Sequence, residues 1–191
     1  MALGQLAKTY IWIDESKIGD SLKLNSRMER ILLDLINGIK EMFKDATPPI
    51  FYHVFKKAGE RKAKSLLRTM ENMKPEDRSA GGGEELLIKV LGRLGAEGYF
   101  QSFELKLKHV DRKAALRVKE PFIFTLKRIA EDNEVELLDD EVSAIGRGLI
   151  AGILSTIAGL EIDAKKAVFY EKRGEVTYIL SEKIYDDLTE L

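Results

Sequence analysis

The hydrophobic pattern changes its period near Gly98, and this change constrains the fold more than any other feature of the sequence. Before Gly98, apolar residues recur at every third or fourth position over residues 26–44, 47–72 and 84–94. That spacing is typical of amphipathic helices. After Gly98, residues 103–108 alternate between apolar and charged, as in a strand that buries one face. The pattern therefore predicts a group of helices followed by a sheet.

The second half of the chain continues the alternation and adds one long apolar helix. Residues 114–119 alternate like residues 103–108, and the two runs predict an antiparallel hairpin. Residues 162–171 and 175–180, joined by a turn, predict a second hairpin. Helical spacing over residues 140–159, and a shorter apolar run at 122–129, predict two further helices. The expected fold class is α+β, with an antiparallel sheet of two hairpins packed against several helices.

The chain is expected to divide into an N-terminal extension, residues 1–46, and a main domain, residues 47–191. Within the extension, residues 8–13 are β-branched and aromatic and predict either a short strand or a tail that docks on the core. The apolar stripe of residues 26–44 is wide and must be buried against something, either the core or a second copy of the chain. The residues expected at a dimer interface are Leu32, Leu35, Ile36 and Ile39.

Composition excludes several kinds of chemistry. The 191 residues include no cysteine and only two histidines, His53 and His109. Disulfides, thiolate nucleophiles, zinc–thiolate sites and a histidine-rich metal site are therefore excluded, and we expect neither a metal nor a cofactor. The net charge is −1, which gives no general reason to expect a nucleic-acid partner. The basic residues within 56–68 form either a patch for an anionic partner or a solvated helix face.

The sequence shows no clear membrane or export signal. Residues 1–14 lack the apolar stretch of a signal peptide. The longest apolar run, residues 144–160, is short, rich in glycine and interrupted by Arg147, so it indicates a buried helix rather than a membrane span. We expect a cytoplasmic protein without membrane insertion.

The glycines of residues 146–152 resemble the spacing of a dinucleotide-binding loop, but their context differs. Such a loop directly follows a strand, whereas the helical spacing here begins at Val142. We therefore interpret Gly148 and Gly152, which are four residues apart, as positions where another backbone approaches one face of a helix.

Large apolar side chains on several elements are expected to form the core, and some of them to line an apolar pocket. The candidate pocket residues are Phe51, Phe55, Phe122, Phe124, Leu149, Ile153, Phe169 and Tyr178. His53 lies in an aromatic neighbourhood, with no nucleophile or orienting acid that can be placed beside it. The sequence therefore predicts no catalytic residue.

The order of these elements, together with several short motifs, resembles a known family. Residues 148–155 and 158–162, with glycines in an apolar helix that precedes the closing hairpin, are similar to the 4-vinyl reductase domain family. The aromatic helix that contains Ala58-Gly59, and the helix that ends at Leu94-Gly95, also resemble that family. The resemblance covers roughly residues 49–180. It implies the fold of the TRAPP vesicle-tethering subunits, an apolar cavity and often a homodimer.

This chain departs from the family at the cysteines. Many relatives carry an acid and two cysteines in the closing hairpin, and this chain has none, so the metal site that the family pattern implies is lost. The resemblance implies that residues 47–191 are a ligand-binding domain, and that the protein is a non-enzymatic, homodimeric binding module for a small hydrophobic or aromatic ligand. The alternatives are a structural homodimer that acts as a scaffold, and a reductase that acts on a vinyl group.

Overall fold

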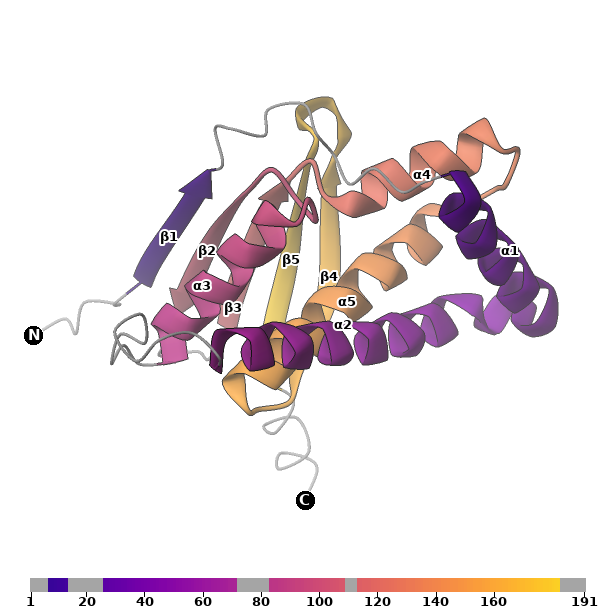
Figure 1. Cartoon of the computed structure of the whole chain (residues 1–191). Coiled ribbons are helices and arrows are strands. Elements are labelled where there is room, and N and C mark those ends of the chain that lie inside the picture. Colours follow the sequence, from indigo (N-terminus) through magenta and orange to yellow (C-terminus); the bar gives the residue numbers. More distant parts are fainter. Residues whose placement is uncertain (1–6, 14–25, 72–82, 109–112, 183–191) are drawn as a thin grey trace, which may run out of the picture.

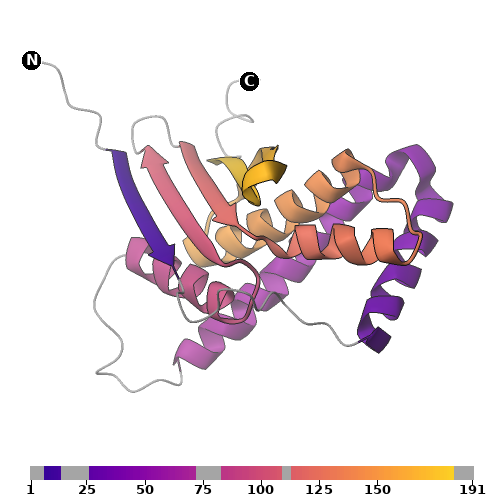
Figure 2. The ribbon, with the colours of Figure 1, turned by 90° about the horizontal axis from the view of Figure 1, so that it is seen from above.

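The computed structural model describes residues 7–13, 26–71, 83–108 and 113–182. These residues form a five-stranded antiparallel sheet with the strand order β1-β2-β3-β5-β4, and the helices gather on one face of that sheet (Figures 1 and 2). The strands are β1 (Ala7–Ile13), β2 (Ser102–Lys108), β3 (Lys113–Lys119), β4 (Ile162–Tyr170) and β5 (Glu175–Glu182). The helices are α1 (Ser26–Phe43), α2 (Thr47–Glu71), α3 (Gly83–Ala96), α4 (Phe122–Asp132) and α5 (Asp139–Ala158), with short 3-10 turns η2 (Lys44–Ala46) and η4 (Glu171–Arg173).

The predicted α+β class is confirmed. Both predicted hairpins are present, as β2–β3 and β4–β5. They lie side by side because β3 pairs with β5. Of the two alternatives for residues 8–13, the structure shows the strand, because β1 pairs with β2 over its whole length. The expected loop near residues 73–83 and the turn near 109–112 lie mainly outside the described residues.

The inner face of the sheet is apolar because alternate side chains of each strand point to the same side. Phe103, Leu105, Leu116, Val118 and Tyr178 are buried there. Charged side chains occupy the other face, where Glu104 forms ion pairs with Lys106 and Arg117. One face of the sheet therefore packs on the helices and the other carries charges.

α5 is the central helix and lies between the sheet and α2 (Figure 2). The expectation that glycines of this helix admit another backbone is confirmed. A Cβ at Gly148 would overlap the carbonyl oxygen of Tyr52 in α2, and a Cβ at Gly152 would overlap that of Lys56. Gly59 makes the reciprocal approach from α2 to the backbone of α5. The two helices thus pack backbone against backbone, and residues 146–152 lie inside a helix rather than in a loop.

α1 belongs to the same core as the later elements. Its residues Leu33 and Ile36 are buried in that core. The Lys40 ammonium lies 2.9 Å from a carboxylate oxygen of Glu141, a residue that is only 3% exposed. The same carboxylate accepts a hydrogen bond from the backbone N–H of Leu138 at the start of α5. Residues on both sides of the expected boundary at 46/47 therefore share one core.

Candidate functional site

The structure divides the eight predicted pocket residues among three places. Phe122, Leu149, Ile153 and Tyr178 meet around a small apolar cavity between the sheet, α3 and α5. The volume of this cavity is about 10 Å³. That space is comparable to one water molecule, whereas a dry cavity that accepts benzene measures roughly 150 Å³. In this conformation these four side chains are packed core.

Phe51 and Phe55 lie away from that cavity, on α2. Phe51 is fully buried, and its ring meets the ring of Phe55 edge to face, with 6.4 Å between the ring centroids. This pair packs α2 into the core and lines neither the interior cavity nor the open concavity described next.

Tyr178 places a phenol inside the apolar core. Burial raises the pKa of its hydroxyl above the ordinary value, so the group stays protonated at neutral pH. Gly146 of α5 makes room for the phenol, because a Cβ at that position would lie 2.5 Å from the hydroxyl oxygen. A third glycine of α5 therefore serves packing against the sheet.

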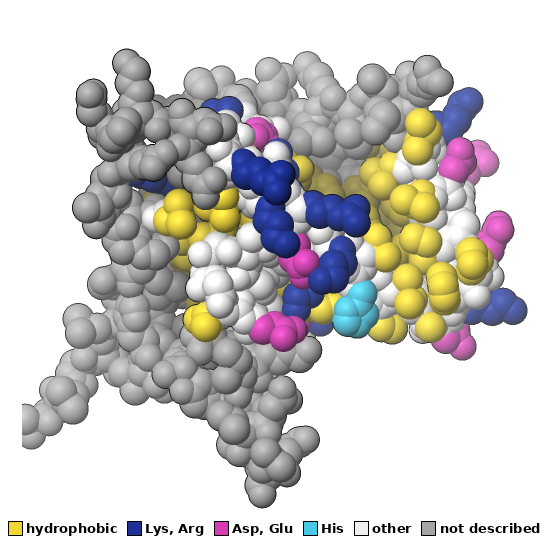
Figure 3. Space-filling model, turned by 60° about the horizontal axis from the view of Figure 1, so that its bottom comes forward, with side chains coloured by type: hydrophobic (Ala, Val, Ile, Leu, Met, Phe, Trp, Pro, Cys, Tyr) yellow, Lys and Arg dark blue, Asp and Glu magenta, His cyan; other side chains and the backbone are white. Residues whose placement is uncertain are grey.

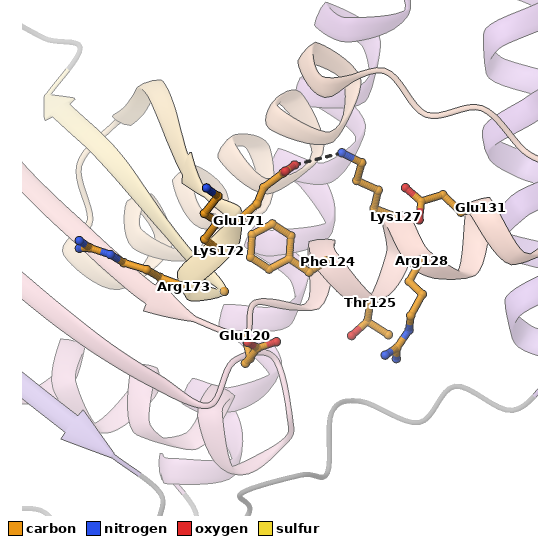
Figure 4. Close-up of a pocket in the computed structure, with 10 residues that line it drawn as sticks. Glu120, Phe124, Thr125, Lys127, Arg128, Glu131, Glu171, Lys172 and Arg173 are labelled. Carbon is orange, nitrogen blue, oxygen red and sulfur yellow. Dashed lines mark hydrogen bonds and ion pairs between the residues drawn. The ribbon is translucent and has the colours of Figure 1, made fainter.

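Phe124 lines a second, open concavity. Phe169 does not line it but packs against Phe124, with 6.3 Å between the ring centroids. We name this concavity the α4 groove. Its volume is about 580 Å³, and its walls are α4 and the η4 turn (Figure 4). The residues that line it are Glu120, Phe124, Thr125, Lys127, Arg128, Glu131, Glu171, Lys172, Arg173 and Gly174. The groove thus combines an aromatic ring with a charged rim.

Lys127 joins the two walls of the α4 groove. Its ammonium donates hydrogen bonds to Asp139 at 3.0 Å and to Glu171 at 3.3 Å. The bond to Asp139, with smaller contributions from Glu171, raises the pKa of Lys127. The positive charge therefore persists at physiological pH and holds the η4 turn near α4 and the start of α5.

A polar cluster joins α2, α5 and β4. The Tyr52 hydroxyl donates a hydrogen bond to Asp163, and the guanidinium of Arg147 lies 5.6 Å from the centre of the Tyr52 ring. Arg147 also donates to the carbonyl oxygens of Ala164 and Lys165, at 3.3 and 3.0 Å. Burial, followed by the bond to Asp163, raises the pKa of Tyr52. Arg147 thus satisfies carbonyl groups where the β4–β5 register is irregular.

Sequence reasoning did not find this cluster, although one signal was available. Arg147 is the only charged residue in the apolar run 144–160, and a charged residue at such a position usually has a specific partner. The three elements that contribute to the cluster are far apart in the sequence, so the partners could not be named without the fold.

The outward face of α1 is apolar and exposed. Ile31, Leu35 and Met42 are 53%, 56% and 76% exposed. Gly38 lies on the same face, and a Cβ placed there would meet nothing within 4 Å. We name these four residues the α1 outer stripe. Figure 3 shows apolar side chains gathered at the end of the molecule that carries α1, beside basic side chains.

The residues predicted for a dimer interface are distributed around α1. Leu35 lies in the α1 outer stripe, whereas Leu32 and Ile39 are half-buried. Ile36 is 1% exposed and is covered by the chain's own core, so it is not accessible to a second copy. The wide apolar stripe predicted from the sequence contains two different faces of α1. One face, with Ile36, packs on the core, and the other, with Leu35, is exposed.

The basic residues of α2 lie on its outer side. Three lysines are engaged, in the ion pairs Lys56–Glu161, Lys57–Glu60 and Lys62–Glu97. The exposed residues Arg61, Lys64 and Arg68 have no ion-pair partner among the residues that the structure describes. Most of these charges are solvated, and nothing in the structure points to an anion held between them.

Two further properties of the described chain bear on the class of site. Within the described ranges, no group of three His, Asp or Glu side chains is placed to hold a metal ion. In the same part of the chain, α5 is long and apolar enough to cross a membrane, but two-thirds of it is buried here against α2 and the sheet.

The chain matches no protein-family model and no curated protein. The resemblance to the 4-vinyl reductase domain, and the TRAPP-like fold that it implies, therefore stay predictions.

Proposed function

We propose that this protein is a non-enzymatic interaction module that works as a homodimer, with the α1 outer stripe as its interface. One observation carries the proposal: α1 is apolar on two opposite faces, and the described part of the chain covers only one of them. Leu33 and Ile36 face the core, whereas Ile31, Leu35 and Met42 face outward. Large apolar side chains grouped on one surface mark sites of association.

The spacing of the α1 outer stripe supports a helix partner. Ile31, Leu35, Gly38 and Met42 follow one another at intervals of four, three and four residues, so they form a narrow row along one face of the helix. A row of this kind packs against a similar row on another helix. In a twofold dimer both copies use the same surface, so the α1 helix of a second copy provides the matching row and no other partner is needed.

Gly38 supports a close approach of that partner. Glycine in a helix interior costs about 1 kcal/mol relative to alanine, and no described residue of this chain uses the space at Gly38. The other helix glycines of this protein show such a use, since Gly59, Gly148 and Gly152 admit the backbone of a neighbouring helix. We assign Gly38 the same role at the contact between two copies of α1.

Two variants of the stripe test the proposal. Leu35→Glu places a charge in the interface, and Gly38→Leu blocks the close approach while it fills empty space in the single chain. Sedimentation equilibrium should show a dimer for the wild type and a monomer for both variants. The matched control is Leu160→Glu, at an exposed leucine outside α1, which should stay dimeric. Circular dichroism checks that each variant is folded.

A second candidate function is the binding of a small apolar ligand in the interior. The observation that favours it is the convergence of Phe122, Leu149, Ile153 and Tyr178 on one cavity. A ligand would have to enlarge that cavity well beyond its 10 Å³. Native mass spectrometry of the freshly purified protein tests this candidate. A stoichiometric apolar molecule supports it, and a protein mass without addition in every preparation contradicts it.

A further inference from the structure

We propose that the α4 groove binds a small aromatic molecule that carries one acidic group. This site lies outside the interface of the proposed function, because none of the residues that line it belongs to α1. The proposal rests on three properties of the groove: its size, its aromatic wall and the distribution of its charges.

The size of the groove suits a small molecule. Its volume of about 580 Å³ lies within the range of roughly 300–1,000 Å³ that ligand sites occupy in proteins. The interior cavity, at about 10 Å³, does not reach that range. The α4 groove can therefore accept a small ligand without rearrangement, whereas the interior cavity cannot.

The aromatic wall provides a surface for a flat ring. In Figure 4 the ring of Phe124 lies between the turn that carries Glu171 and Lys172 and the part of α4 that carries Lys127 and Arg128. Phe124 is only partly buried, and Phe169 supports it from β4. Offset or edge-to-face contact between aromatic rings adds to the burial of apolar area. A second ring on Phe124 would gain both contributions.

The charges of the groove favour an anion. Four cationic side chains line it against three carboxylates. Lys127 and Glu171 are engaged with each other, and the carboxylate of Glu120 packs against Gly174. Arg128, Lys172 and Arg173 have no ion-pair partner within the described residues. Figure 4 shows Arg128 on α4 and Lys172 and Arg173 on the η4 turn, so both walls of the groove carry a cation, although the guanidinium of Arg173 points away from Phe124.

The turn that carries two of these cations is held in place. Gly174 has a φ of 62°, and Glu120, whose φ is 46°, donates its backbone N–H to the Gly174 carbonyl oxygen at 2.7 Å. The left-handed backbone conformation at position 174 favours glycine, and a side chain there would also displace the Glu120 carboxylate. Lys127 adds the ion pair to Glu171. A wall fixed in this way loses less entropy when a ligand binds.

The experiment compares naphthoate with its neutral amide, naphthamide, on the full-length protein by two-dimensional NMR titration. Naphthoate should shift the backbone amides of residues 122–128 and 171–174, and naphthamide should bind about tenfold more weakly, because charge-assisted hydrogen bonds to the carboxylate are lost. The variant Arg128→Gln/Lys172→Gln/Arg173→Gln should weaken naphthoate binding about tenfold or more. The matched control, Arg61→Gln/Lys64→Gln/Arg68→Gln on α2, should bind naphthoate like the wild type.

Two further measurements keep the proposal falsifiable. Thr125→Trp fills the groove from its wall and should abolish the shifts, even if the triple variant folds poorly. Leu35→Glu should leave them unchanged, which separates this site from the dimer interface. The proposal is overturned if naphthoate causes no shifts, if the shifts map to other elements, or if naphthamide binds equally well. It is also overturned if the α2 control weakens binding as much as the groove variant.

Discussion

Glycine has two contrasting positions in the helices of this protein. Gly148 and Gly152 lie where α5 meets α2, and any Cβ there overlaps a carbonyl oxygen of α2. Gly38 faces open space on α1. Packing inside the chain thus requires glycine at positions 148 and 152. No contact within the described chain explains the glycine at position 38.

This contrast predicts opposite effects of alanine on stability. Gly152→Ala should lower the free energy of unfolding by about 2 kcal/mol, because the helices must separate to admit the methyl group. Gly38→Ala should raise it by up to about 1 kcal/mol in dilute protein, because alanine is the better helix former. Urea denaturation measures both. Equal effects of the two substitutions would contradict the backbone contact between α2 and α5.

The ion pair of Lys40 with the buried Glu141 leads to a second residue-scale prediction. Lys40→Met removes the cation and leaves the carboxylate in the core, which should cost about 3 kcal/mol of stability. The double variant Lys40→Met/Glu141→Gln should lose less than the sum of the single changes, because no unpaired charge remains. Thermal and urea denaturation of the four proteins provide the test, and strict additivity would show that the two residues do not interact.

The buried phenol of Tyr178 makes stability depend on alkaline pH. Burial raises its pKa in the folded chain, so the unfolded chain loses this proton first as the pH rises past about 10, the ordinary value for tyrosine. The buried phenol therefore contributes fully to the free energy of unfolding below that pH, and its contribution decreases above it. Tyr178→Phe should flatten the decrease in unfolding free energy above pH 10, measured by urea denaturation at several pH values. An unchanged slope would show that Tyr178 is not the source.

At the scale of elements, periodicity predicted the helices and strands and their buried faces better than it predicted which elements contact one another. The alternation at 103–108 and 114–119 was enough for the β2–β3 hairpin, and the glycine spacing in α5 was enough for a close helix contact. Periodicity shows that a face is buried, but not what covers it. For this reason Ile36 was grouped with Leu35, although one faces the core and the other faces outward.

Contacts between distant segments could not be predicted in the same way. The eight candidate pocket residues are all large and apolar, and the sequence does not distinguish a packed core from the wall of an open groove. Phe124 and Phe169 come together beside charged residues of α4 and η4 only because α4 begins beside the end of β4. The Tyr52–Asp163 hydrogen bond likewise depends on α5 bringing α2 and β4 together.

At the scale of the whole molecule, the described chain presents two outward features, the α1 outer stripe and the α4 groove, and the cavity between the sheet, α3 and α5 measures only about 10 Å³. So small a cavity reduces the support for a ligand at that place and increases the weight of association between copies. If both proposals hold, each dimer carries two grooves outside its interface.

The most direct test of the central claim is the distance between the α1 helices of two copies. The chain has no cysteine, so Asp34→Cys, at an exposed position beside the α1 outer stripe, accepts a single spin label. Helices that pack through glycine have axes about 8 Å apart or less, within the 8–10 Å range typical of helix pairs or just below it. Pulsed dipolar spectroscopy should therefore show one short distance between labels, which Gly38→Leu abolishes. Absence of dipolar coupling in the concentrated protein, or a coupling that persists in Gly38→Leu, would contradict the account.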